Sequence, residues 1–292
     1  MVDASKRPTG LELYTLAAEA AASQVIAAYS TSFGWATKLL GREFCQPVEN
    51  IYSLVRVADE IVDGAAAGAG VSEPGQLLDE LEAETYRAMS SGFSANIVVH
   101  AFARTARASG IGREIVEPFF YSMRQDLTVV EHDQASFERY VYGSAEVVGL
   151  MCLQVFMQGR TYTEADRATL VAGARALGAA FQKVNFLRDL AADFKALGRS
   201  YFAGVNAANF DESTKQRLVA DIDTDLDAAR ASLALLPTRP RRAVAAALGL
   251  FAELNRRIAR TSATTLIEAR IRVPNNVKLV ILVRAILAPK SL

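Results

Sequence analysis

The sequence predicts an all-α protein, a single-domain helical bundle around a central cavity. Apolar residues recur three and four positions apart along most of the chain, which is the period of an amphipathic helix. The alternation of apolar and polar residues that marks a half-buried strand is scarce. With 292 residues, 51% of them hydrophobic, the chain can bury a large core. No Ser/Gly, Pro-rich or charged tract divides it, so we expect one domain over residues 1–292.

Prolines and glycines separate this pattern into helices. A proline suits the first turn of a helix but disrupts its interior, so we expect the eight prolines at breaks between helices. The glycine-rich stretch 64–70 and the stretch 198–209 are expected to be loops. The expected helices are 12–40, 47–64, 74–90, 94–108, 112–131, 136–158, 164–196, 211–235, 240–270 and 275–288.

Composition excludes several classes of function. Lys plus Arg number 32 and Asp plus Glu number 32, so the chain lacks the basic excess of a nucleic-acid-binding protein. Cys45 and Cys152 lack the spacing of a metal site or of a disulfide framework. His100 and His132 are the only histidines, and we interpret both as structural or exposed rather than as metal ligands or triad members.

Localisation is predicted from what the sequence lacks. Residues 1–10 contain no apolar signal segment, and no uncharged run of about 18 apolar residues occurs. The best candidate for such a run, Val277 to Ala288, is short and interrupted by Arg284. We expect a cytoplasmic protein that can rest on a membrane surface. The basic cluster 239–242 suits anionic lipid or, more simply, a solvated helix start.

An acidic motif, Asp59-Glu60-Ile61-Val62-Asp63, lies in the expected helix 47–64. Asp59 and Asp63 are one turn apart and share a face, which Arg56 and Tyr52 extend toward the start of the helix. Two carboxylates on one face repel each other unless a cation lies between them, and Mg²⁺ prefers such oxygen ligands together with phosphate oxygens. The alternative is a solvated helix end at which Arg56 pairs with Asp59, and this motif alone leaves both interpretations open.

A second polar stripe lies in the expected helix 164–196, where the oxygen-bearing residues are three, four and four positions apart: Gln182, Asn185, Asp189 and Asp193. They fall within about 80° of the helix circumference. The preceding residues 172–181 are almost wholly small or apolar. A polar stripe on a buried helix is costly unless its groups are satisfied, so it indicates a polar site or a buried hydrogen-bond network. Lys183 points off this face and is left out of the site.

The two stripes together indicate a binding site. If the two helices face each other, the carboxylates line two walls of one cavity. Acidic walls require cations, and bound cations attract a polyanion, for which diphosphate is the natural candidate. Below this acidic mouth the helices continue in Ala, Gly, Val, Leu and Phe, so we expect an apolar tunnel that suits a long hydrocarbon.

These segments resemble the two aspartate-rich motifs of the squalene/phytoene synthase family. Asp59 to Asp63 matches the first motif, and Asn185-Phe-Leu-Arg-Asp-Leu-Ala-Ala-Asp193 matches the second. Three further segments match the family in the same order: Tyr29-Ser-Thr-Ser-Phe33, Tyr140-Val-Tyr-Gly143 and Gly198-Arg-Ser-Tyr201. The resemblance covers residues 25–285 approximately and is closest to the bacterial, phytoene-forming members of the family.

The resemblance implies the class I isoprenoid synthase fold and the head-to-head joining of two prenyl diphosphates. Two geranylgeranyl diphosphates would condense through prephytoene diphosphate to phytoene and release diphosphate. The implied ligands of Mg²⁺, or of Mn²⁺ in its place, are Asp59, Asp63, Asn185, Asp189 and Asp193. The implied diphosphate-binding residues are Tyr29, Ser30, Tyr52, Arg56, Gln182, Asn185 and Arg188. Tyr140 matches a tyrosine near the reacting carbons and joins the four aspartates in the catalytic set.

Two other functions stay open: a squalene or dehydrosqualene synthase that uses farnesyl diphosphate, and a non-catalytic helical partner with the same fold. Tyr29, Glu146 and Phe251 depart from some relatives, which carry histidine, glycine and tyrosine there. Thr37 lies two turns beyond Tyr29, about 11 Å along a helix axis, at a place that is bulky in relatives with a shorter pocket. Because threonine is small, we expect room for the geranylgeranyl chain, unless Thr37 faces another helix.

Overall fold

The protein is represented by a computed structural model, which describes residues 9–192, 201–206 and 209–289. All regular elements of these residues are helical, as the periodicity predicts. In chain order they are α1 (Gly10–Tyr29), α2 (Thr31–Lys38), α3 (Arg42–Val62), α4 (Ala65–Gly68), α5 (Pro74–Ser91), α6 (Ile97–Ser109), α7 (Arg113–Thr128), α8 (Gln134–Val141), η1 (Tyr142–Glu146), α9 (Val147–Met157), α10 (Glu164–Ala192), α11 (Glu212–Ser232), η3 (Leu233–Leu235), α12 (Thr238–Arg260), α13 (Ala263–Leu266) and α14 (Asn275–Leu287).

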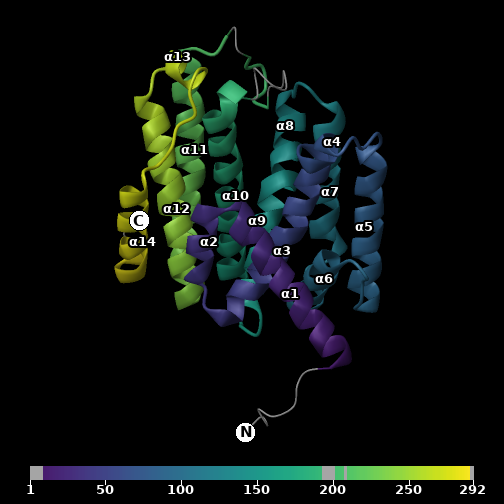
Figure 1. The fold of residues 1–292 in the computed structure, drawn as a ribbon. Helices are drawn as coiled ribbons and strands as arrows, with labels where there is room; N and C mark the ends of the chain where they lie inside the picture. The colour runs from purple at the N-terminus through teal and green to yellow at the C-terminus, as the bar shows by residue number, and fades with distance from the viewer. Residues whose placement is uncertain (1–8, 193–200, 207–208, 290–292) are drawn as a thin grey trace.

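The long helices run roughly parallel to one axis and form a bundle with α10 at its centre (Figure 1). The helix α10 packs against α11, α9 and η1, and α12 closes the bundle beside α11. On the other side α5, α6 and α7 pack on α3 and α9. Both α3 and α10 end at the upper end of the bundle in Figure 1, so the acidic residues near their C-termini lie at the same end.

Four expected elements were wrong in detail. The expected helix 12–40 is broken at Ser30, whose backbone is extended, because serine and threonine side chains compete for backbone hydrogen bonds and favour helix ends. The expected helix 136–158 contains a five-residue π-helix, η1. The expected helix 240–270 ends at Arg260, and the short helix α13 follows it. The expected loop 64–70 contains one helical turn, α4.

Two prolines do not lie at breaks. Pro47 and Pro118 are each the sixth residue of their helices, α3 and α7. Each removes a hydrogen bond to the carbonyl four residues earlier, at Glu43 or Glu114. Both of these residues are exposed, so water can bind the freed carbonyl, and the helices continue through the prolines.

The π-helix η1 lies between α7 and α10 because glycines allow close backbone contact. A methyl group at Gly143 would overlap the carbonyl oxygen of Pro118 and the hydroxyl of Ser122 on α7. A methyl group at Gly178 on α10 would lie 2.5 Å from the carbonyl oxygen of Ala145 in η1. Contacts this close leave no room for a side chain at either glycine. Gly143 therefore lets η1 lie close to α7, and Gly178 lets it lie close to the central helix α10.

One helical stretch of the described chain, Gln134 to Met157, is long and apolar enough to cross a membrane. It comprises α8, η1 and α9, and half of its most apolar window is buried inside the protein. Since it packs against α3, α7 and α10, its apolar character is that of a core helix.

Candidate functional site

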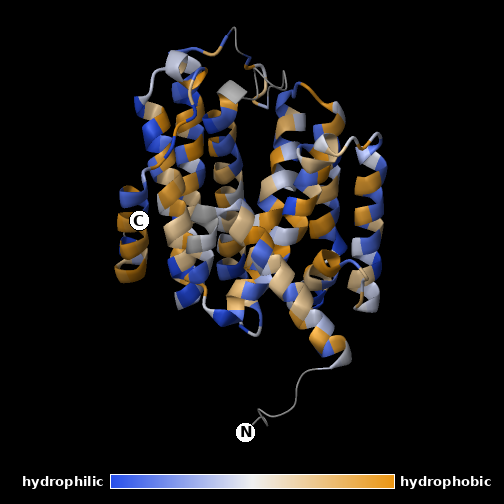
Figure 2. Cartoon of the chain, in the orientation of Figure 1, coloured by the Kyte–Doolittle hydropathy of each residue, from blue (hydrophilic) through white to orange (hydrophobic). Residues whose placement is uncertain are grey.

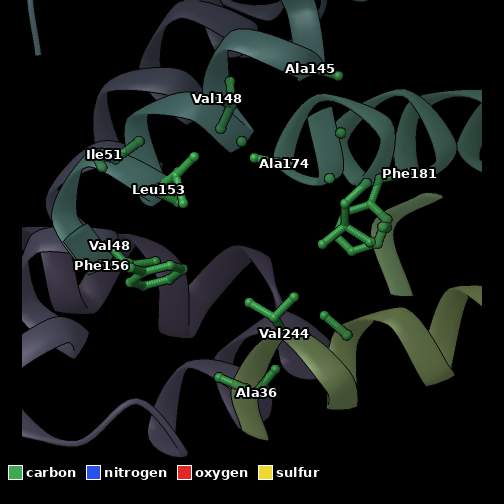
Figure 3. A pocket seen from close by; sticks show the side chains of 18 of the residues that line it. Ala36, Val48, Ile51, Ala145, Val148, Leu153, Phe156, Ala174, Phe181 and Val244 are labelled. Atoms are coloured by element: carbon green, nitrogen blue, oxygen red, sulfur yellow. The ribbon is translucent and has the colours of Figure 1, made fainter. Parts of the chain in front are cut away.

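A cavity of about 300 Å³ lies inside the bundle, at the lower end of the range of ligand pockets. Figure 3 shows apolar side chains from several helices around an open centre. They include Ile51, Val148, Leu153, Phe156, Phe181 and Val244. Such a wall suits a hydrocarbon ligand, because the transfer of apolar surface out of water lowers the free energy.

Residues from both polar stripes share this cavity. Tyr52 on α3 and Asn185 on α10 both line it, so the two helices do face each other across one space. The side-chain oxygen Oδ1 of Asn185 is buried and has no hydrogen-bond partner among the described residues. A buried carbonyl oxygen is costly to leave unpaired, so this atom is a candidate ligand-binding atom.

The first stripe, on α3, contacts Tyr29 and Ser30 at the end of α1. Arg56 forms an ion pair with Glu60, and its Nη1 lies 3.8 Å from Oδ2 of Asp59. The guanidinium of Arg56 lies 4.3 Å from the centre of the Tyr29 ring, a cation–π contact. The side chain of Tyr29 hydrogen-bonds Glu60, and that of Ser30 hydrogen-bonds Tyr52. The helix break at Ser30 therefore brings both residues beside the acidic motif.

The surroundings of Asp59 disfavour the charged form of its carboxyl group. Burial, with the nearby charges of Asp63 and Glu60, raises its pKa to about 7, although Arg56 opposes the rise. The side chain is still 39% exposed, so solvent screening moderates this rise. A carboxyl that is half protonated near neutral pH is one that a bound cation would stabilise in its charged form.

In the second stripe, Asp189 pairs with two arginines. The Nε of Arg188 donates to Oδ1 of Asp189 at 3.0 Å, and the Nε of Arg270 lies 2.7 Å from the same oxygen. Lys183 lies off the stripe, as expected, and binds Asp221 and Asp225 on α11 at 2.6 and 2.8 Å. Gln182 is half-buried on α10, and Asp193 lies outside the described residues.

Tyr140 lies deep beside both stripes. Its hydroxyl donates to Oδ1 of the buried Asp126 at 2.8 Å. Its ring lies 6.1 Å from that of Phe186 on α10, and the charge of Asp63 acts on it from α3. Burial, followed by the charge of Asp126, raises the pKa of Tyr140 well above its usual value. Its phenol therefore stays neutral at physiological pH and presents an electron-rich face.

The sequence reasoning missed two residues of this site. Asp126 follows Phe119, Phe120 and Met123 on the buried face of α7, and a lone carboxylate on such a face is a usable signal. Arg270 reaches Asp189 from a loop 81 residues later in the chain, and no local pattern indicates that contact.

Three other residues can now be placed. Thr37 is buried and lines the cavity, so it does not merely face another helix. Phe251 stacks on the cavity residue Phe181 with ring centres 3.8 Å apart. Glu146 pairs with Arg175 on α10 at 2.7 Å and so links η1 to the central helix. The side chain of Phe33, at the end of the Tyr29 motif, lies outside the described part of the structure.

Both histidines have structural surroundings. His100 is buried and its Nε2 lies 3.0 Å from the hydroxyl of Thr15, and burial lowers its pKa. His132 is also buried and lies 5.1 Å from Tyr140, ring centre to ring centre. Burial lowers the pKa of His132 as well, which keeps it neutral. Neither is part of a cluster of three metal-ligating side chains, and the described residues contain no such cluster.

Comparison with known proteins decides the family. A sequence model described as squalene/phytoene synthase matches residues 26–276. The chain belongs to the squalene/phytoene synthase family. It is 28% identical to the 15-cis-phytoene synthase of Pantoea ananas over 254 residues, which is 80% of each chain. It is also 28% identical over 258 residues to the 15-cis-phytoene synthase of a Paracoccus species, covering 81% of this chain and 80% of that one.

Solved structures share the fold. A dehydrosqualene synthase in complex with a ligand superposes with a TM-score of 0.79 at 21% identity, covering 96% of this chain and 99% of that one. The squalene synthase HpnC from Alicyclobacillus acidocaldarius superposes with a TM-score of 0.73 at 18% identity, covering 85% and 95%. At these identities the likeness establishes the all-α isoprenoid synthase-like fold of this family member.

Proposed function

We propose that this family member condenses two geranylgeranyl diphosphates head to head, through prephytoene diphosphate, to phytoene. The observation that carries the proposal is the apolar cavity whose wall includes Tyr52 from the first polar stripe and Asn185 from the second. A site built this way can hold two diphosphates at its acidic end and two hydrocarbon tails in its interior. The similarity to two 15-cis-phytoene synthases supports the reaction and the carotenoid product.

The residues of the acidic end fit Mg²⁺. Asp59, Asp63, Asp189 and Asn185 offer only hard oxygen atoms, and Asp193 would add another. The unpaired Oδ1 of Asn185 and the raised pKa of Asp59 both support a cation-binding role for these side chains. When bound, Mg²⁺ would neutralise charge on the diphosphate that leaves. Mn²⁺ is the alternative with the same ligand preference.

The arginines of the site would change partners when substrate binds. Arg56 and Arg188 pair with Glu60 and Asp189 in the structure. Because guanidinium groups bind phosphate oxygens in a planar fork, we expect both to transfer to diphosphate while the carboxylates turn to metal. Tyr29, Ser30, Tyr52 and Gln182 would complete the polar wall around the diphosphates.

The chain's own residues would then protect and guide the cations. The carbon–oxygen bond of one substrate breaks, and the electron pair leaves with diphosphate. The double bond of the second substrate attacks the allylic cation, and loss of a proton closes the cyclopropane of prephytoene diphosphate. A second ionisation, rearrangement and proton loss give phytoene. The apolar wall excludes water that would quench these cations, and the neutral ring of Tyr140 stabilises positive charge.

A farnesyl diphosphate-using squalene or dehydrosqualene synthase is the second candidate, favoured by the shared fold of such enzymes. Thr37 favours the longer substrate, because it lines the cavity and is small. A non-catalytic helical partner is disfavoured by the intact acidic motifs.

The deciding experiment incubates the purified protein with Mg²⁺ and either geranylgeranyl or farnesyl diphosphate, followed by identification of the hydrocarbon. We expect phytoene from the first substrate and loss of all product in excess EDTA. Squalene or dehydrosqualene as the main product would select the second candidate. Unchanged turnover in EDTA would contradict the metal site, and no product with either substrate would favour the non-catalytic partner.

A further inference from the structure

The helix α14 presents an apolar face to solvent. Five of its large apolar side chains, between 38% and 78% exposed, form this face: Leu279, Val280, Val283, Ile286 and Leu287. They are spaced one, three, three and one residues apart and so follow one side of the helix. We call this set the α14 face.

The opposite side of the helix attaches it to the bundle. Ile281 and Ala285 are buried, and α12 is the element against which α14 packs most. Figure 1 shows α14 as the outermost helix on its side of the bundle, and Figure 2 shows its lower half as strongly hydrophobic. A continuous exposed apolar patch of this kind marks a surface that binds another apolar body.

The charge around the α14 face is one-sided. The segment from Ala269 to Leu292 contains no Asp or Glu, although the whole chain is neutral with 32 residues of each sign. Its cations are Arg270, Arg272, Lys278, Arg284 and Lys290. Arg270 is bound to Asp189, but Arg272, Lys278 and Arg284 have no carboxylate partner among the described residues.

More arginines lie just before the helix. A cleft of the surface is lined by Arg256, Arg260 and Arg272, with Glu253 as its only acidic residue. Glu253 is buried and already paired with Arg256 and Arg257. Arg260 and Arg272 therefore leave net positive charge in this cleft, and Arg272 precedes the first residue of α14 by three positions.

This combination selects an anionic lipid surface over a second copy of the chain. A symmetric dimer through the α14 face would bring Lys278 and Arg284 of both copies together, and like charges repel. A bilayer with anionic headgroups instead supplies apolar depth for the face and negative charge for its flanks. The 13-residue helix is about 20 Å long, shorter than a bilayer core, so it would lie in the membrane plane.

We propose that the α14 face, flanked by Arg260, Arg272, Lys278 and Arg284, docks this protein on an anionic lipid bilayer. The basic cluster around Arg241, considered earlier as a lipid contact, is a poorer candidate. Arg241 donates hydrogen bonds to the carbonyl oxygens of Ala234 and Leu236 and is used within the fold. The proposal does not depend on the reaction, since lipid binding is measured without substrate.

Vesicle co-sedimentation tests the proposal with the full chain. Vesicles of phosphatidylcholine are compared with vesicles that also contain phosphatidylglycerol. We expect binding to the anionic vesicles that weakens as salt is raised. The double variant Leu279→Glu/Val283→Glu should lose at least tenfold in affinity. Its matched control, Leu11→Glu/Leu13→Glu, changes equally exposed residues on α1 and should bind like the wild type.

A second variant tests the charge separately. Arg260→Gln/Arg272→Gln should bind the anionic vesicles more weakly and with a smaller salt dependence. Thermal melts check that each variant is folded. Leu279, Val283, Arg260 and Arg272 are all exposed, so we expect their substitution to leave the fold intact. The proposal is overturned if the α14 variant binds like the wild type, or if the wild type does not bind anionic vesicles. A dimer seen by light scattering that the α14 variant abolishes, without lipid binding, would assign the face to a second copy.

Discussion

The substitution Asp59→Asn should stabilise the protein without metal and abolish its activity. The Asp59 carboxyl has a pKa raised to about 7 by burial and by its acidic neighbours. In the unfolded chain the same group has a pKa of about 3.9. Between these two values the folded state holds a proton that the unfolded state releases, so this group makes the protein less stable as pH rises from about 4 to about 7.

The size of this effect can be bounded. A rise of about three pKa units corresponds to at most about 4 kcal/mol. Since the side chain is 39% exposed, solvent screening reduces this to about 1–2 kcal/mol at pH 8. For a chain of this size each kcal/mol moves the melting temperature by about 2–4 °C. Asparagine has the same shape without the charge, so Asp59→Asn should raise the Tm at pH 8 by about 2–8 °C.

Thermal melts in EDTA between pH 5 and pH 8 provide the assay. The wild type should lose more stability across this range than the variant, so their curves should lie closest at pH 5 and furthest apart at pH 8. The control Asp227→Asn removes an exposed carboxylate on α11 that pairs with Arg230, and it should leave the pH dependence unchanged.

Function supplies the second readout. Mg²⁺ with an unreactive diphosphate analogue should stabilise the wild type much more than Asp59→Asn, and turnover of the variant should fall by orders of magnitude. Identical pH dependence in both proteins would refute the electrostatic reasoning. Near wild-type turnover would refute the assignment of Asp59 to the metal site.

Three other tests concern separate parts of the structure. Thr37→Phe should lower turnover of geranylgeranyl diphosphate more than that of farnesyl diphosphate, because overfilling the cavity clips the longer chain; equal losses would remove Thr37 from the pocket that sets chain length. Gly143→Ala should lower the free energy of unfolding by about 1–3 kcal/mol, because the methyl overlaps the α7 backbone. Gly68→Ala, which meets open space, is its control in denaturant titrations, and equal stability of the two variants would contradict the close contact. Tyr140→Phe and Asp126→Asn should each lower stability, and the double variant should cost less than the sum, as double-mutant cycles in urea would show. Simple additivity would mean that the two groups do not interact.

Much of this fold follows from local periodicity. The helical spacing of apolar residues predicts α3 and α10, and it places Asp59 with Asp63 on one face and Asn185 with Asp189 on another. These are properties of neighbouring residues on one helix, so a sequence read alone contains them. The break at Ser30 was missed although serine favours helix ends, and the π-helix η1 was missed because it depends on how α7 and α10 pack.

The family motifs also follow from the sequence, because their order and spacing are linear properties. The aspartate motifs, with the tyrosines at Tyr29 and Tyr140, predicted the family that the comparison then confirmed. The roles of the individual motif residues stay predictions, and the substitutions above test them.

Only the tertiary structure decided which distant groups meet. Arg270 binds Asp189 across 81 residues of sequence, and Asp126 accepts the hydrogen bond of Tyr140 from another helix. The raised pKa of Asp59 likewise depends on burial that no local pattern contains. Hydrogen bonds and desolvation act over a few ångströms in space, whereas a sequence records distance only along the chain. The polar partners of the site therefore became visible only when the helices were packed together.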